Sequence, residues 1–160
     1  MAEPMSDDAQ PAAQAGDPQP QAPLEPFGQA ESWKLISAGG VGRIGYSGRY
    51  GPTILPVNFR VQDNVIYFRT ARHSTMEEDL HTGIAHADYK VAFEIDRFDD
   101  TAHAGWSVLV QGDVHPMESD DELAVASQAG VESWVCGPRD LFMRITPTKV
   151  TGHRVGQLPG

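Results

Sequence analysis

The alternation of apolar and polar positions is clearest between residues 41 and 81, where it predicts three short strands followed by a helix. Apolar side chains recur at roughly every second position over 41–46, 54–59 and 65–68, and many are β-branched or aromatic, which is typical of strands. Asp63-Asn64 predicts a tight turn between the second and third strands, because both residues tolerate positive φ angles or close Asx turns. Connections this short predict antiparallel pairing.

The third of these strands delivers polar side chains to a loop. Arg69 and Thr70 end the strand, and Ser74 and Thr75 open the helix, with Ser74 as the expected N-cap and Glu77 as its capping-box partner. An arginine and several hydroxyls beside a helix N-terminus predict a place where an anion such as a phosphate could bind. A polar loop that only caps a helix would show the same pattern, so spacing alone leaves both interpretations open.

The rest of the chain adds two helices and four strands. One helix is expected over 29–38, where Gly39-Gly40 ends it, since glycine accepts the left-handed conformation that follows a helix. The other is expected over 119–129, with Ser119 and Glu122 as its capping box. The further strands are expected over 90–96, 105–116, 141–146 and 149–155.

Two positions in these strands carry expectations of their own. Gly112 marks a bulge or a place where another group approaches closely. Pro147 is expected to break the strand at 141–146, so that the last strand, 149–155, lies at a sheet edge. About seven short strands with small helices between them predict an all-β, barrel-like core with helical plugs.

The first 28 residues differ in composition from the rest. They consist mainly of Pro, Ala, Gln and acidic residues, with hardly an aromatic or β-branched side chain. Such a segment buries too little apolar surface to offset its ordering entropy. We therefore expect a disordered tail over 1–28, one folded domain over 29–155, and a flexible end over 156–160.

Charge and cysteine content exclude several classes of partner. The net charge is −10 and there is no basic stripe, which argues against nucleic acid as a partner. No apolar run approaches the roughly 20 residues of a membrane helix. The single cysteine, Cys136, leaves no intramolecular disulfide and fits a reducing compartment. We expect a cytoplasmic protein that binds neither nucleic acid nor membranes.

The familiar catalytic and metal-binding motifs are missing from the sequence. His81 and His86 are five residues apart, which does not place them on one helical face, and no Cys-x-x-Cys occurs, so we expect no metal site. Neither a Gly-x-Ser-x-Gly elbow nor a Gly-rich nucleotide loop is present. What remains is the polar cradle after the third strand, together with Trp106-Ser107. Trp106 offers flat apolar area to a planar ligand or to the core.

Taken in order, these segments resemble the flavin-binding split-barrel proteins related to pyridoxamine 5′-phosphate oxidase. The chain is most similar to their small actinobacterial-type branch, which includes nitroimidazole-resistance proteins. No single segment is specific, and the resemblance rests on order and spacing over about residues 33 to 155. The matching segments are Val41-Gly42-Arg43-Ile44-Gly45, Leu55-Pro56-Val57-Asn58-Phe59, Phe68-Arg69-Thr70-Ala71 with Ser74, Val91 to Asp96, Gly105 to Gly112, and Arg144 to Gly152.

The resemblance implies a mainly β fold, an antiparallel split β-barrel of six strands with a few short helices. It also implies a homodimer, with flavin mononucleotide (FMN) in a cleft between the subunits. Carried over by position, Pro56, Val57, Asn58 and Phe59 would run along the isoalloxazine and ribityl groups. The phosphate would be held by Arg69, Thr70, Ser74 and Thr75. Trp106 and Ser107, from the facing strand or the partner chain, would close the cleft.

The sequence departs from the family at one important position. Relatives usually carry Lys or Arg just after the serine, where this chain has Thr75 and Met76. A charge-assisted bond to phosphate is roughly twice as strong as a neutral one, so the loss of this basic residue would weaken phosphate binding. We expect Arg72 to compensate for that loss. Otherwise the chain would hold its flavin loosely, take a deazaflavin or hold none. His153 also stands where relatives often have Arg.

The resemblance implies three classes of function. The first is a flavin-dependent oxidoreductase that acts on a small organic substrate, with the flavin as the reactive group and no assignable side-chain acid or base. The second is a non-catalytic binding or carrier protein for flavin, deazaflavin or haem. The third is an oxygen-dependent haem-handling protein of the same fold, with a histidine ligand such as His73, His103 or His153. The fold does not decide among these.

Overall fold

A computed structural model describes residues 22–81, 89–134 and 136–157. Seven strands and three helices follow one another in the described chain. The strands are β1 (Leu24–Phe27), β2 (Gly40–Gly48), β3 (Gly51–Gln62), β4 (Val65–Thr70), β5 (Tyr89–Asp99), β6 (Ala104–Met117) and β7 (Leu141–Val155). The helices are α1 (Gln29–Ile36), α2 (Thr75–Leu80) and α3 (Asp120–Ala129).

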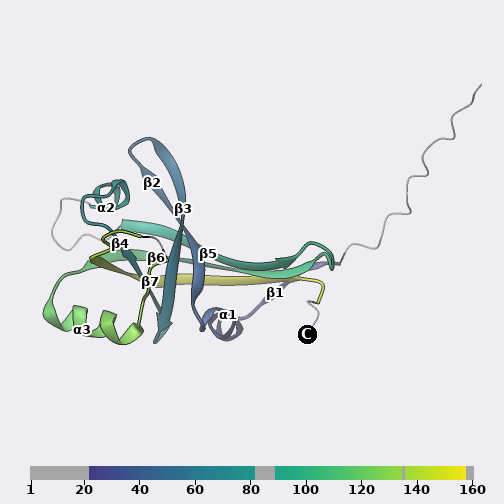
Figure 1. The fold of residues 1–160 in the computed structure, drawn as a ribbon. Helices are drawn as coiled ribbons and strands as arrows, with labels where there is room; N and C mark the ends of the chain where they lie inside the picture. Colours follow the sequence, from purple (N-terminus) through teal and green to yellow (C-terminus); the bar gives the residue numbers. More distant parts are fainter. Residues whose placement is uncertain (1–21, 82–88, 135, 158–160) are drawn as a thin grey trace, which may run out of the picture.

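Six of the strands close into a barrel. The sheet order is β1-β7-β4-β3-β2-β5-β6, and a further pairing between β6 and β7 closes the ring. Every pairing is antiparallel. Closure is possible because β7 has fifteen residues and pairs with β4 along one edge and with β6 along the other. The expected mainly β, antiparallel split barrel with short helices is confirmed, and its long strands are visible in Figure 1.

The turns follow the local sequence. Gly48 pairs with Gly51, so the hairpin between β2 and β3 turns through only two residues. Asp63 and Asn64 join β3 to β4 with φ angles of 51° and 59°. Two successive positive φ angles match the twist of the flanking strands, so the turn predicted at these residues is confirmed.

The prediction that Pro147 ends a strand is wrong. β7 continues from Leu141 to Val155, and it lies between β6 on one side and β4 and β1 on the other. Pro147 pairs with Gly112 where the register between β6 and β7 shifts, and proline is tolerated in a sheet at such a bulge. A Cβ on Gly112 would lie 2.2 Å from the Thr146 carbonyl oxygen, so the close approach predicted at Gly112 is confirmed.

One strand lies inside the segment that was expected to be a disordered tail. Leu24–Phe27 forms β1, which pairs with the last residues of β7. The ring of Phe27 occupies the space that a Cβ on Gly152 would need, because glycine leaves that face of β7 open. The domain boundary therefore moves from residue 29 to Leu24. The remainder of the expected tail, up to Gln21, lies outside the described residues.

The core fills the barrel and continues under the helices. The rings of Phe59, Phe68 and Phe93 are fully buried, and the centroids of Phe59 and Phe93 lie 5.3 Å apart in an edge-on arrangement. α1 contributes Trp33 and Ile36 to this cluster, and α2 contributes its own apolar face, Met76 and Leu80. α3 covers a second cluster with Tyr67, Met117, Ala126 and Val131. None of the described helices is long and apolar enough to cross a membrane.

Candidate functional site

A groove of about 280 Å³ lies where β3, β4, the first turn of α2 and the loop after α3 meet. β3 and β4 are neighbours in the barrel, and α2 follows β4 directly, so three consecutive elements form most of the wall. The lining residues are Leu55, Pro56, Val57, Asn58, Arg69, Thr70, Ser74, Thr75, Met76, Glu132, Ser133 and Arg139.

Seven of the ten residues that the sequence analysis assigned to a cofactor line this groove together. β3 contributes three of them, β4 two, and the turn into α2 the other two. They are Pro56, Val57, Asn58, Arg69, Thr70, Ser74 and Thr75.

The other three lie elsewhere. The side chain of Phe59 is 2% exposed and belongs to the core. Trp106 and Ser107 stand at the start of β6, next to the β5–β6 turn, which lies at the far end of the long strands from α2 (Figure 1). A single chain therefore does not bring Trp106 or Ser107 to the groove. Trp106 instead lines a separate cavity of about 370 Å³ with Phe27 and Arg154.

Arg69 is held by an aromatic ring and keeps unused hydrogen-bonding capacity. Its guanidinium carbon lies 4.8 Å from the centre of the Phe142 ring, a distance at which the ring face attracts a cation. Its Nε atom is buried and has no hydrogen-bond partner among the described residues. A buried donor without a partner costs free energy. Arg69 also lines the groove, which places its positive charge beside any ligand there.

Thr70 and Ser74 form a hydroxyl pair beside Arg69. The two side-chain oxygens lie 3.1 Å apart, and the Ser74 oxygen also accepts from the backbone N–H of Glu77 at 3.2 Å. Each hydroxyl has only one hydrogen to donate. If one hydroxyl donates to the other, the second keeps its hydrogen for a further acceptor. The pair can therefore give one hydrogen bond to a ligand oxygen.

The first turn of α2 is fixed by its cap. Ser74 caps the helix as predicted, but the carboxylate of Glu77 accepts from the backbone N–H of His73 at 3.1 Å rather than from that of Ser74. The Ser74 N–H is already bonded to the carbonyl of Ala71, so the capping box predicted here is only half formed. The cap orients the Ser74 hydroxyl toward the groove wall.

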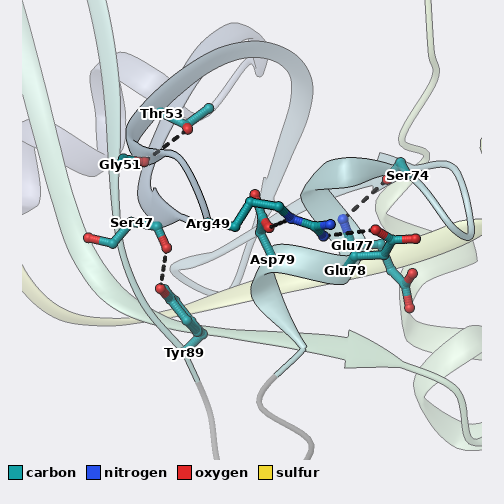
Figure 2. Close-up of polar contacts among 9 residues, drawn as sticks. All are labelled: Ser47, Arg49, Gly51, Thr53, Ser74, Glu77, Glu78, Asp79 and Tyr89. Atoms are coloured by element: carbon teal, nitrogen blue, oxygen red, sulfur yellow. Dashed lines mark hydrogen bonds and ion pairs between the residues drawn. The ribbon is translucent and has the colours of Figure 1, made fainter.

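An arginine from the β2–β3 turn holds α2 from its other side. Arg49 donates to Asp79 at 2.7 Å and to Glu78 at 2.8 Å (Figure 2). The hydrogen bond with Asp79, followed by that with Glu78, raises the pKa of Arg49, so the guanidinium remains charged. The Tyr89 hydroxyl bonds to the carbonyl of Ser47 in the same region. The two bonds of Arg49 hold α2 against the β2–β3 turn, and the Tyr89 bond joins β5 to β2 beside it.

The loop at 131–140 was not assigned to the site by sequence reasoning. Glu132, Ser133 and Arg139 line the groove, and the backbone N–H of Trp134 donates to Oδ1 of Asn58 at 3.0 Å. This contact joins residues 76 positions apart. No local pattern in the sequence signals such a contact, so the only hint was an arginine within a loop.

Arg72 does not take the place in the groove that the sequence analysis gave it. Its guanidinium lies near Glu118 at 3.4 Å and Asp140 at 3.5 Å, and it is absent from the groove lining. The backbone N–H groups of Arg72 and Asp140, and then the positive charges of Arg72 and Arg69, hold the pKa of Asp140 below its ordinary value. The guanidinium of Arg72 is therefore engaged outside the groove.

The three histidines considered as haem ligands lie apart from the groove. His73 and His103 are exposed and adopt positive φ angles in turns. His153 lies on β7, opposite Ser107 of β6. None of the three lines the groove.

Fold and groove together define a split-barrel protein with a groove on one side of the barrel that is lined by arginine and hydroxyl side chains as well as apolar ones. The sequence matches the pyridoxamine 5′-phosphate oxidase family over residues 28–154, and the chain belongs to that family. The match covers every described strand except β1, which ends one residue before the match begins, and the last residue of β7.

Relatives in actinobacteria share the fold over nearly their whole length. An uncharacterized protein of Mycobacterium tuberculosis, Rv0080, is 29% identical over 145 residues, which cover 91% of this chain and 94% of the relative. The FAD binding protein of Mycobacterium smegmatis has a TM-score of 0.67 and 29% identity, with 81% of this chain and 98% of that one covered. A conserved protein of unknown function from Corynebacterium diphtheriae has a TM-score of 0.64 and 27% identity, covering 84% of this chain and 99% of that one.

Proposed function

We propose that this protein is a flavoprotein that binds FMN in the groove, with the flavin phosphate at Arg69, Thr70 and Ser74. The observation that carries the proposal is that Arg69, whose Nε has no hydrogen-bond partner among the described residues, lines the groove beside a hydroxyl pair with one hydrogen to spare. A guanidinium and hydroxyl groups are the donors that phosphate oxygens favour. The FAD binding protein of Mycobacterium smegmatis, which shares the fold, supports a flavin as the ligand.

The wall formed by β3 would hold the rest of the flavin. Pro56 and Val57 offer apolar surface, and Asn58 offers a side-chain amide whose oxygen is already bonded to the Trp134 N–H. The amide NH₂ of Asn58 is then free to donate to a ribityl or ring oxygen. Thr75 stands at the helix end of the same groove and would add a hydroxyl near the phosphate.

We also propose a homodimer in which the second protomer supplies Trp106 and Ser107. Within one chain these two residues lie at the other end of the barrel, so only a second copy could bring them to the groove. β3 carries exposed apolar side chains beside the groove, with Ile54 at 70% and Leu55 at 36% exposure. Adjacent exposed apolar residues are typical of an interaction surface. A subunit interface over β3 would cover them.

The activity proposed for this site is redox chemistry on a small organic substrate. When bound, the flavin supplies the hydride and electron transfer, and the chain binds and orients it and excludes water. The alternative is a carrier that binds flavin without turnover. Deazaflavin would fit the same donors. A cytoplasmic location remains a prediction from the single cysteine.

The substitution Arg69→Ala tests this site. Because FMN and riboflavin differ only in the phosphate, the change should weaken FMN binding by about 10- to 100-fold, the range of a lost charged hydrogen bond. Riboflavin binding should change by less than about threefold by the same reasoning. Fluorescence quenching of each flavin, titrated with protein, measures both affinities.

Arg60→Ala is the matched control. Arg60 also lies on a barrel strand, but its guanidinium donates to the carbonyl of Ala38 and is absent from the groove lining, so FMN affinity should stay at the wild-type value. Equal losses of FMN and riboflavin in Arg69→Ala would show that Arg69 does not contact the phosphate, and the proposed site would then be wrong.

A further inference from the structure

The groove holds a second guanidinium, and we infer that Arg139 is the second cation of the phosphate site, in place of the basic residue that the helix lacks at Thr75 and Met76. This inference rests on the proposed flavin site. Arg139 lines the groove and is half-buried. It forms no ion pair with any other described residue, although Glu132 lines the same groove.

The charges of the groove favour this second cation. Among the described residues, the lining contains three charged side chains, Arg69, Glu132 and Arg139. A phosphate monoester carries a charge of about −1.5 to −2 at neutral pH. The charges of Arg69 and Glu132 would cancel each other. The net positive charge that could attract the phosphate therefore comes from Arg139. The first turn of α2 is acidic, with Glu77 and Glu78, and adds no positive charge.

The loop that carries Arg139 is held in place at three points. Val131 is buried in the second core cluster. The Trp134 backbone N–H is bonded to Asn58 on β3. Asp140 accepts from the backbone N–H of Arg72 at 3.3 Å, next to the start of β7. Arg139 directly precedes this last anchor in the chain, and its side chain lines the groove.

Arg72 is the competing candidate, and its contacts argue against it. It pairs with Glu118 and Asp140 outside the groove, so its charge is already compensated. A guanidinium paired with two carboxylates would have to break those contacts to reach a ligand. Arg139 has no such contacts with the described part of the chain, and binding it to phosphate costs mainly the ordering of one side chain.

The test compares Arg139→Gln with Arg139→Lys and Arg72→Gln in titrations with FMN and riboflavin. Arg139→Gln should weaken FMN about tenfold and riboflavin less than about twofold, because one charge-assisted bond to the phosphate is lost. Arg139→Lys should restore part of the FMN affinity, and Arg72→Gln should match the wild type. Equal effects of Arg139→Gln on both flavins, or a loss in Arg72→Gln alone, would overturn the inference.

A second readout separates this inference from the proposed function. The thermal unfolding midpoint is measured in sodium phosphate and in sodium chloride at matched ionic strength, because a ligand that binds the folded state raises it. Phosphate should stabilise the wild type more than Arg139→Gln. If the wild type binds neither flavin but keeps this Arg139-dependent stabilisation, the flavin proposal fails and the inference stands. If phosphate stabilises both proteins equally, the inference fails whatever the flavin result.

Discussion

Glu122 shows how one side chain determines where a helix begins. Its Oε2 accepts from the backbone N–H groups of Ser119 and Glu118, each at 3.1 Å. Its other oxygen lies 3.0 Å from Nε2 of His115 and 3.7 Å from the Arg144 guanidinium. Burial raises the pKa of Glu122, but the hydrogen bonds from Ser119 and Glu118 outweigh it and lower the pKa to about 2. The capping box predicted for this helix is thus complete.

The lowered pKa makes α3 a source of pH-dependent stability. A carboxylate whose pKa is about 2 when folded and ordinarily 4.5 stabilises the fold above pH 4.5, and this contribution is lost as the pH falls toward 2. Glu122→Gln should lower the free energy of unfolding at neutral pH by about 1–2 kcal/mol, after allowance for solvent screening. It should also flatten the decline in acid. Urea denaturation from pH 7 to pH 3 measures both effects.

Asp121→Asn is the control for this experiment. Asp121 is an exposed carboxylate in the same helical turn, so its replacement should leave the acid-dependent decline as steep as in the wild type. An unchanged pH dependence in Glu122→Gln would mean that the Glu122 charge contributes nothing to the stability of α3.

Among the elements, β7 joins the two halves of the barrel, and its contact with β6 depends on a glycine. Gly112 faces Pro147 at the register shift, and a Cβ there would lie 2.2 Å from the Thr146 carbonyl oxygen. Backbone cannot move aside as a flexible side chain can. Gly112→Ala should therefore lower the free energy of unfolding by about 2–3 kcal/mol, the usual cost of overpacking. Chemical denaturation gives the value directly.

Gly28→Ala is the matched control for Gly112→Ala. Gly28 is the N-cap of α1, has a φ of −73°, and has nothing within 4 Å of an added Cβ, so its change should cost no more than about 0.5 kcal/mol. Similar losses for the two variants would show that the close approach at Gly112 is not what limits the fit of β6 against β7.

Local sequence patterns predicted the elements and site residues whose conformation depends on residues nearby in the chain. Arg69, Thr70 and Ser74 come together because a strand end and a helix cap follow one another in the sequence. β1 was missed because four residues with one proline show no alternation, and only pairing with β7 makes them a strand. Arg139 was missed because its loop is fixed by contacts with distant residues, such as the Trp134–Asn58 bond. The strand end predicted at Pro147 was wrong because the bulge that accommodates this proline depends on Gly112.

At the scale of the whole molecule, one chain forms only part of the site that we propose. The groove with Arg69 lies near α2, and Trp106 lies at the opposite end of the long strands (Figure 1). A homodimer with two equivalent clefts would bring each groove against the far end of the other copy, as a twofold arrangement requires. Flavin binding and dimerisation are therefore expected together.

Sedimentation velocity of the protein mixed with FMN, followed at the visible absorption band of the flavin, tests this directly. We predict that the flavin absorbance sediments with the protein boundary, at the rate of a dimer. Flavin absorbance that stays behind with the free small molecule would contradict the account. If the flavin instead sediments with a monomer, the groove would still be the binding site, and the proposed cleft between two subunits would be wrong.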